Sequence, residues 1–126
     1  MTTSQEQFCL RQHFTDEEDK KRGYAGGMSA NRINAGLGTI ISQVLEQVGR
    51  EKIAGLYTTG GDTMVNVCYQ LGVECIEVMD YVIPQTDVGR LVGKYDGLPV
   101  VGKGGLTGND NTACDIVERL FKESAR

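Results

Sequence analysis

The sequence predicts an α/β fold: a layered domain with a mixed, largely parallel sheet flanked by helices. Helical and strand-like apolar patterns alternate along residues 29–126, and the strand-like runs are short and bounded by glycine or proline. Such alternation is typical of layered α/β domains. With 126 residues, 40% hydrophobic and 24% charged, the chain has the size and composition of one domain with one core.

The overall composition argues against several classes of function. The formal net charge is −4 and no basic stripe is visible, which argues against a nucleic acid or an anionic membrane surface as partner. No segment approaches the ~20 apolar residues of a membrane span, and the N-terminus lacks the apolar core of a secretory signal. The four cysteines (Cys9, Cys68, Cys75 and Cys114) form no CxxC pair, and His13 is the single histidine. We therefore expect a cytoplasmic protein with reduced thiols and no metal site of its own.

Residues 1–28 are polar and include the charge run DEEDKKR, so we expect a leader that is partly disordered or loosely helical. The folded domain is predicted to span residues 29–126. It opens with an amphipathic helix capped by Ser29 and ended by Gly49. Gly36 and Gly38 inside this helix would let another element approach closely. Its apolar residues are predicted to share one face: Ile33, Leu37, Ile40, Ile41, Val44, Leu45 and Val48.

The remaining elements follow from short apolar runs and their boundary residues. A strand over 53–58 is expected to be buried on both faces, and a helix over 63–71 ends at Gly72. Strands are predicted over 73–82, ended by Pro84, over 88–92 as a short edge strand, and over 98–102. A last helix begins near Ala113 with Asn109 or Asn111 as its cap.

The first glycine-rich turn, TTGGDT, lies where the strand 53–58 gives way to a helix. Gly60 and Gly61 would let backbone N–H groups approach an anion, and the helix N-terminus adds a favourable dipole. Thr63 could donate its hydroxyl to a phosphate, and Asp62 could cap the helix or position a metal or hydroxyl. A plain strand-to-helix turn capped by Asp62 explains the same residues equally well.

The second glycine-rich turn, KGGLTGND, follows the strand 98–102 in the same way. Gly104, Gly105 and Gly108 free the backbone for close approach, and Lys103 supplies a mobile positive charge suited to phosphate. The spacing matches neither a P-loop nor a dinucleotide-binding GxGxxG. A glycine-rich turn with a solvent-facing lysine is the alternative. If the two strands are neighbours, the two turns together form a composite anion site.

Other polar residues are weaker candidates. Asp80 and Asp87 could line the crevice, although ordinary surface carboxylates are the commoner case. Asn31, Arg32 and Asn34 could reach the site from the start of the long helix, or could simply be a polar helix start. No Ser-His-Asp or Cys-His pair is expected.

Taken in order, GLYTTGGDT, then VIPQTDVGRLVGKYDGLPVVGKGGLTG, then a terminal helix resembles the C-terminal nucleotide-binding domain of the four-carbon acid sugar kinase family. The resemblance covers residues 29–126. It implies that Gly60, Gly61, Asp62 and Thr63 contact ATP, and that Lys103, Gly104, Gly105 and Gly108 close over its phosphates. The second turn departs from the family pattern, which has Ser and Phe where this chain has Gly104 and Thr107.

The resemblance further implies Mg²⁺-ATP as cofactor and transfer of the γ-phosphoryl group to a hydroxyl of a four-carbon sugar acid. That acceptor would require an additional substrate-binding domain, so the isolated chain is expected to be inactive. Asp62 is a candidate for the catalytic base. The alternative is a stand-alone, non-catalytic nucleotide-binding or oligomerisation module. A face left exposed by the missing domain would favour a homo-oligomer.

Overall fold

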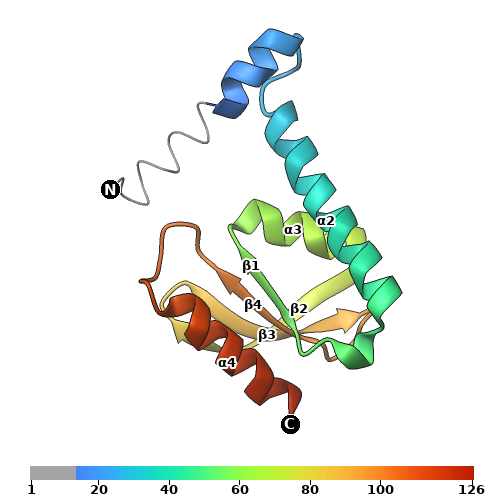
Figure 1. Cartoon of the computed structure of the whole chain (residues 1–126), viewed down its shortest axis with the longest axis vertical. Helices are drawn as coiled ribbons and strands as arrows, with labels where there is room; N and C mark the ends of the chain where they lie inside the picture. Colours follow the sequence, from blue (N-terminus) through green and yellow to red (C-terminus); the bar gives the residue numbers. More distant parts are fainter. Residues whose placement is uncertain (1–13) are drawn as a thin grey trace.

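A computed structural model describes residues 14–126 (Figure 1). Residues 14–22 form a helix, and the elements that follow are, in chain order, α2 (Met28–Val48), a 3-10 turn η1 (Arg50–Lys52), β1 (Leu56–Thr59), α3 (Gly61–Leu71), β2 (Val73–Ile83), β3 (Thr86–Gly93), β4 (Pro99–Lys103) and α4 (Thr112–Ser124). Cys9 and His13 lie outside the described residues. Cys68, Cys75 and Cys114 are free thiols, the first half-buried and the other two exposed.

The sheet is mixed, as predicted, but its parallel share is smaller than expected. The strand order is β1-β4-β3-β2, and only β1 and β4 are parallel, whereas β3 runs antiparallel to both of its neighbours. The predicted edge strand over 88–92 is therefore the inner strand β3. The strand expected to be buried on both faces is instead the short edge strand β1, in which Thr58 alone is buried.

Helices cover both faces of the sheet, and each face has its own core. On one face α2 and α3 pack with the sheet around Leu45, Val67, Leu71, Leu91, Leu98 and Val100. On the other face α4 packs around Val88, Val101, Ile116 and Leu120. Val100 and Val101 point to opposite faces, because successive side chains alternate along a strand. The α/β layered architecture is thus confirmed.

The long helix α2 begins differently from the prediction. Ser29 is not its cap: Gly27, with φ 84°, precedes the first helical residue, Met28. The backbone N–H groups of Gly27 and Ser29 donate to the carboxylate of Asp19 over 2.8 and 2.7 Å. Asp19 belongs to the helix 14–22 and is buried. Hydrogen bonding to the Ser29 side chain, and then to the N–H groups of Ser29 and Gly27, holds its pKa below the ordinary value. The Asp19 carboxylate, eight residues before Gly27 and on the preceding helix, thus takes the place of a local cap. The helix ends at Val48 before Gly49, as predicted.

Only part of the apolar face of α2 is packed. At Gly38 an added Cβ would lie 2.8 Å from both the Asn66 carbonyl oxygen and Gln70 Cγ, so this glycine lets α2 approach α3 closely, as expected. At Gly36 an added Cβ would meet no atom within 4 Å, so this glycine is not needed for close packing. Leu45 is buried, but five apolar residues, here called the α2 stripe, are exposed by 42–56%: Ile33, Leu37, Ile40, Val44 and Val48. The N-terminal half of α2 extends away from the sheet (Figure 1).

The end of α4 is held by a cluster of charged side chains around Glu123. Its buried carboxylate accepts from Arg119 Nε over 2.9 Å and lies within 3.4 Å of Arg90 and 3.2 Å of Arg126. Arg119 also donates to Asp80 over 2.8 Å. Hydrogen bonds from Arg119 lower the pKa of both carboxyl groups. Asp80 is therefore an ion-pair partner of α4.

The remaining boundaries are close to the predicted ones. Gly72, with φ 70°, ends α3, and Pro84 follows β2. Asn111 occupies the cap position of α4 without a side-chain hydrogen bond to the helix. Of the predicted leader, residues 1–13 lie outside the described residues.

Candidate functional site

The two glycine-rich turns lie side by side at one edge of the sheet. The last residues of β1 and β4, Thr59 and Lys103, are paired in register, and the Gly60 N–H donates to the Lys103 carbonyl oxygen over 2.9 Å. α3 and the loop that leads to α4 both leave the sheet at this end (Figure 1). The sequence left open whether the two strands are neighbours; they are, and the two turns therefore lie together. Crevices at the carboxyl ends of parallel strands are where open α/β sheets bind ligands.

Both turns offer backbone N–H groups that could bind an anion. α3 begins at Gly61, and the first amides of a helix have no acceptor within it. Among residues 14–126, the amides of Gly105 and Gly108 likewise donate to no protein group. A helix N-terminus and a loop with free amides thus lie at the same edge, which is an arrangement suited to phosphate.

The glycines of this site fall into two groups. Gly60 and Gly108 have φ of 90° and 106°, where a side chain is strained, so the fold itself requires glycine there. Gly61 and Gly105 have ordinary backbone conformations, and an added Cβ at either would meet nothing within 4 Å. The protein could accommodate alanine at both positions. Their lack of a side chain is instead what close approach of a ligand to the backbone would require.

Lys103 does not extend into solvent, in contrast to the simple-turn alternative. Its ammonium group donates to the carbonyl oxygens of Gly104 and Thr107 over 2.7 and 2.6 Å. The Thr107 hydroxyl donates to the same Gly104 carbonyl over 3.0 Å. The second turn is therefore closed around the lysine.

In the first turn, two of the predicted roles change. Asp62 does not cap α3, because Gly60 holds the cap position and no side chain caps the helix. The Asp62 side chain is exposed in the first turn of α3, beside the free amides. Thr63 donates its hydroxyl to Asn34 Oδ1 over 3.0 Å, which links α3 to α2. Asn34 thus reaches the site, as the sequence suggested, but through Thr63.

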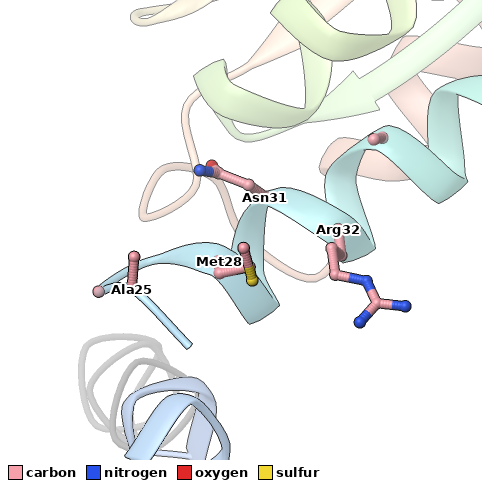
Figure 2. Close-up of a pocket in the computed structure, with 6 residues that line it drawn as sticks. Ala25, Met28, Asn31 and Arg32 are labelled. Atoms are coloured by element: carbon pink, nitrogen blue, oxygen red, sulfur yellow. The ribbon is translucent and has the colours of Figure 1, made fainter. Parts of the chain in front are cut away.

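The other polar candidates have different positions. Asp87 is exposed and pairs in register with Gly102, one residue before the end of β4, so it lies near the site. Asn31 and Arg32 line a separate open hollow of about 420 Å³ at the start of α2, and Figure 2 shows that they point to different sides of the helix. Arg32 donates to the Tyr24 hydroxyl over 2.7 Å.

Three residues at this edge were not singled out from the sequence. Gln85, in the β2–β3 hairpin, has φ 62°, and its carbonyl oxygen accepts from the Gly104 N–H over 2.8 Å. The hydroxyls of Thr58 and Thr86 are buried with no hydrogen-bond partner in residues 14–126, and these residues pair in register with Gly102 and Lys103. Pro84 predicted a turn before Gln85. That this turn lies beside Gly104 depends on the antiparallel pairing of β3 with β4, which the sequence did not reveal.

The residues present suit a nucleotide-bound magnesium ion better than a metal held by protein alone. Across residues 14–126 no three His, Cys, Asp or Glu side chains are grouped so that they could hold a metal ion. Mg²⁺ at nucleotide sites is bound through one or two carboxylates and the phosphates, and it keeps several waters. Asp62 lies in the first turn, Asp110 in the second and Asp87 opposite Gly102, and all three residues are exposed.

A family described as "Nucleotide-binding C-terminal domain" matches residues 1–113. The chain belongs to this family. The match begins in the predicted leader and includes both glycine turns.

None of the helices described within residues 14–126 is both long and apolar enough to cross a membrane.

The family's relatives include two kinases of four-carbon sugar acids. The chain is 45% identical over 93 residues to a D-erythronate kinase of Heliobacterium modesticaldum, an alignment that covers 73% of this chain and 21% of the relative. It is 36% identical over 87 residues to a D-threonate kinase of Salmonella typhimurium, covering 68% of this chain and 20% of the relative. The chain thus spans about a fifth of the length of these curated relatives.

Solved structures with this fold come from Bordetella bronchiseptica. Two crystal forms of a domain of unknown function, both described as a domain-swapped dimer with bound citrate, superpose with TM-scores of 0.64 and 0.65 at 27% identity. They cover 79% and 81% of this chain and 24% of the solved chain.

Proposed function

We propose that this chain is the ATP-binding part of a kinase that phosphorylates a four-carbon sugar acid. The observation that carries the proposal is the bond between the two turns, from the Gly60 N–H to the Lys103 carbonyl oxygen over 2.9 Å. It holds two sets of free amides at one edge of the sheet. The similarity to D-erythronate and D-threonate kinases supports a sugar acid as acceptor.

In the complete kinase this chain's residues would bind and orient ATP. The phosphates would accept from the amides of Gly61, Asp62 and Thr63 and from those of Gly105 and Gly108. Phosphoryl transfer depends mainly on positioning and on stabilisation of charge, which fixed amides and the Lys103 ammonium supply. Mg²⁺ would neutralise charge on the phosphates when bound.

The proton of the acceptor hydroxyl requires a base. We keep Asp62 as the candidate within this chain, because its carboxylate is exposed beside the amides expected to hold the phosphates. The sugar acid itself would bind to an additional domain of the kind that the longer relatives have room for. The reaction would take place in the cytoplasm, where ATP is available.

Calorimetric titration of the chain with Mg²⁺-ATP, ADP and adenosine tests nucleotide binding. We expect ATP and ADP to bind and Gly61→Ala to weaken both by about tenfold or more, because a methyl group there would occupy space next to the phosphates. Gly36→Ala is the matched control: Gly36 also has nothing within 4 Å, but it lies in α2 away from the turns. No binding of either nucleotide to the wild-type chain would refute the proposal.

A kinase assay tests the division of labour between domains. We expect the isolated chain to transfer no phosphoryl group to D-erythronate or D-threonate, because the acceptor site is missing. Joined to a substrate-binding domain of a relative, it should do so, and Asp62→Asn should reduce kcat more than the affinity for ATP. Robust phosphorylation by the isolated chain would contradict this division.

A second candidate function is a non-catalytic module that assembles with itself. The α2 stripe leaves five apolar side chains 42–56% exposed, and the structural relatives are described as domain-swapped dimers. We propose a homo-oligomer that covers this stripe, since apolar patches of this kind mark interaction sites. Sedimentation of the wild type and of Ile40→Glu tests it: a monomeric wild type at micromolar concentration would reject the assembly.

A further inference from the structure

We propose that Lys103 acts as a positioning residue, which orients the amides of Gly105 and Gly108 for the anion before any nucleotide binds. This role differs from that of a mobile charge that reaches out to the phosphate. It rests on the proposed function only for the identity of the ligand, because the orientation is a property of the free chain.

The first step of the argument is the pair of bonds made by the ammonium group. Lys103 Nζ lies 2.7 Å from the Gly104 carbonyl oxygen and 2.6 Å from the Thr107 carbonyl oxygen. Hydrogen bonds from a charged donor at this length are among the stronger ones in proteins. Two of the three N–H groups are thereby committed to the loop, and one remains for an anion.

The second step is the geometry of the peptide group. In a trans peptide the C=O and the N–H of the next residue point in opposite directions, and no peptide bond of the described residues is cis. Since the Gly104 carbonyl points at Nζ, the Gly105 N–H points away from it. The Thr107 carbonyl fixes the Gly108 N–H in the same way. The lysine therefore sets the direction of two amides without touching them.

The third step is that these are free amides. Within residues 14–126 neither the Gly105 nor the Gly108 N–H has a protein acceptor, whereas the Gly104 N–H is taken by Gln85 and the Asn109 N–H by Thr112. The two oriented amides are thus among the loop amides that remain available to a ligand, together with the Leu106 N–H between them. Gly105 has nothing within 4 Å of a would-be Cβ, so the space beside it is open.

The two bonds from Lys103 are the shortest hydrogen bonds in this loop. Gly105 lacks a side chain, and glycine is the residue with the greatest backbone freedom. The Thr107 hydroxyl and N–H contribute two longer bonds, of 3.0 and 3.3 Å, to the Gly104 carbonyl. Without the ammonium, we expect the Thr107 carbonyl to turn toward water and the Gly104 carbonyl to keep only the two longer bonds from Thr107, so that the amides behind them lose their common direction.

Backbone ¹⁵N relaxation of the ligand-free chain tests the proposal without any nucleotide. We expect order parameters of about 0.8 for the Gly105 and Gly108 amides in the wild type and values below about 0.6 in Lys103→Met. Lys103→Arg, which keeps several donors and the charge, should retain most of the order. Lys52→Met is the matched control, since Lys52 precedes the start of β1, at the end of that strand away from the two turns, and its loss should leave the loop unchanged.

Low order in the wild-type loop, or unchanged order in Lys103→Met, would overturn the proposal. If Lys103→Met does not fold, Lys103→Gln, with a shorter and uncharged side chain, replaces it. Titration with ADP then tests the consequence: we expect binding about tenfold weaker in Lys103→Met, with Lys103→Arg closer to wild type. Lost order with unchanged ADP affinity would also overturn it. A wild type that binds no ADP but shows the ordered loop would refute the proposed function and leave the positioning intact.

Discussion

Replacing Gly60 with alanine should destabilise the fold, whereas the same change at the adjacent Gly61 should not. Gly60 has φ 90° and ψ 133°, a backbone conformation in which a Cβ is strained. The nearest atom to a Cβ at this position would be Thr63 Oγ1 at 3.8 Å, so the cost is conformational and involves no clash. Gly61 is helical, and its would-be Cβ has no neighbour within 4 Å.

The expected magnitude follows from these two geometries. Holding a residue other than glycine in a sparsely populated backbone region costs about 1–3 kcal/mol. A chain of this size loses about 4 °C of Tm per kcal/mol, so Gly60→Ala should lower Tm by about 4–12 °C. If the backbone relaxes instead, the Gly60 N–H bond to Lys103 is lost and the two turns separate. Gly61→Ala should leave Tm unchanged or raise it, because alanine is the better helix former.

Thermal denaturation followed by circular dichroism, with both variants in the same buffer, measures the difference. Calorimetry with ADP completes the comparison: both substitutions should weaken binding, Gly60→Ala through the moved turn and Gly61→Ala through the added methyl. Equal Tm values for the two variants would refute the conformational argument. Undiminished ADP binding by Gly60→Ala would show that the position of the first turn does not matter for the ligand.

Three further predictions concern packing and charge. Gly102→Ala should lower the free energy of unfolding by less than about 1 kcal/mol in urea denaturation, because the added Cβ would meet Met64 Cε, the far end of a flexible side chain that can turn away, and a loss of about 3 kcal/mol would contradict this. The pKa values of Asp80 and Glu123 are lowered in the folded protein, so their ion pairs stabilise the fold fully above the ordinary values of 3.8 and 4.5, and this stabilisation is lost as the pH falls through the lower folded values. The urea concentration at half-unfolding should therefore decrease once the pH is lowered below 4.5. A urea midpoint that stays constant down to about pH 3 would refute this. Asp19→Asn should speed amide exchange at the start of α2, and unchanged exchange there would show that the carboxylate does not cap the helix.

The α/β layered fold could be predicted from local patterns, but the order and direction of the strands could not. Glycines and then a helix follow both β1 and β4, so the two turns were expected to meet if these strands were neighbours, and the strands are neighbours. That rule needs only local patterns and the parallel pairing of two strands. The contact of these residues with a nucleotide remains a prediction.

What the sequence could not provide depends on contacts between distant residues. Ser29 has the chemistry of a cap, but the carboxylate that binds its N–H group belongs to Asp19, on another helix. The run 88–92 looked like an edge strand, because a short apolar run does not reveal which strands flank it. The period of α2 defined its apolar face correctly. It could not show that Ile33 and Ile40 would be left uncovered while Leu45 is buried.

The irregular pairing of β2 bears on how this domain stays dispersed. β2 is an 11-residue strand at the edge of the described sheet, and Val78, Met79 and Tyr81 on it are more than half exposed. A long, flat, apolar edge would recruit strands from other molecules. The register shifts near Val73, Val78 and Tyr81 interrupt the regular ladder at three points. Irregularities of this kind bend a strand and increase its local twist, which makes a regular ladder with a second strand harder to extend along this edge.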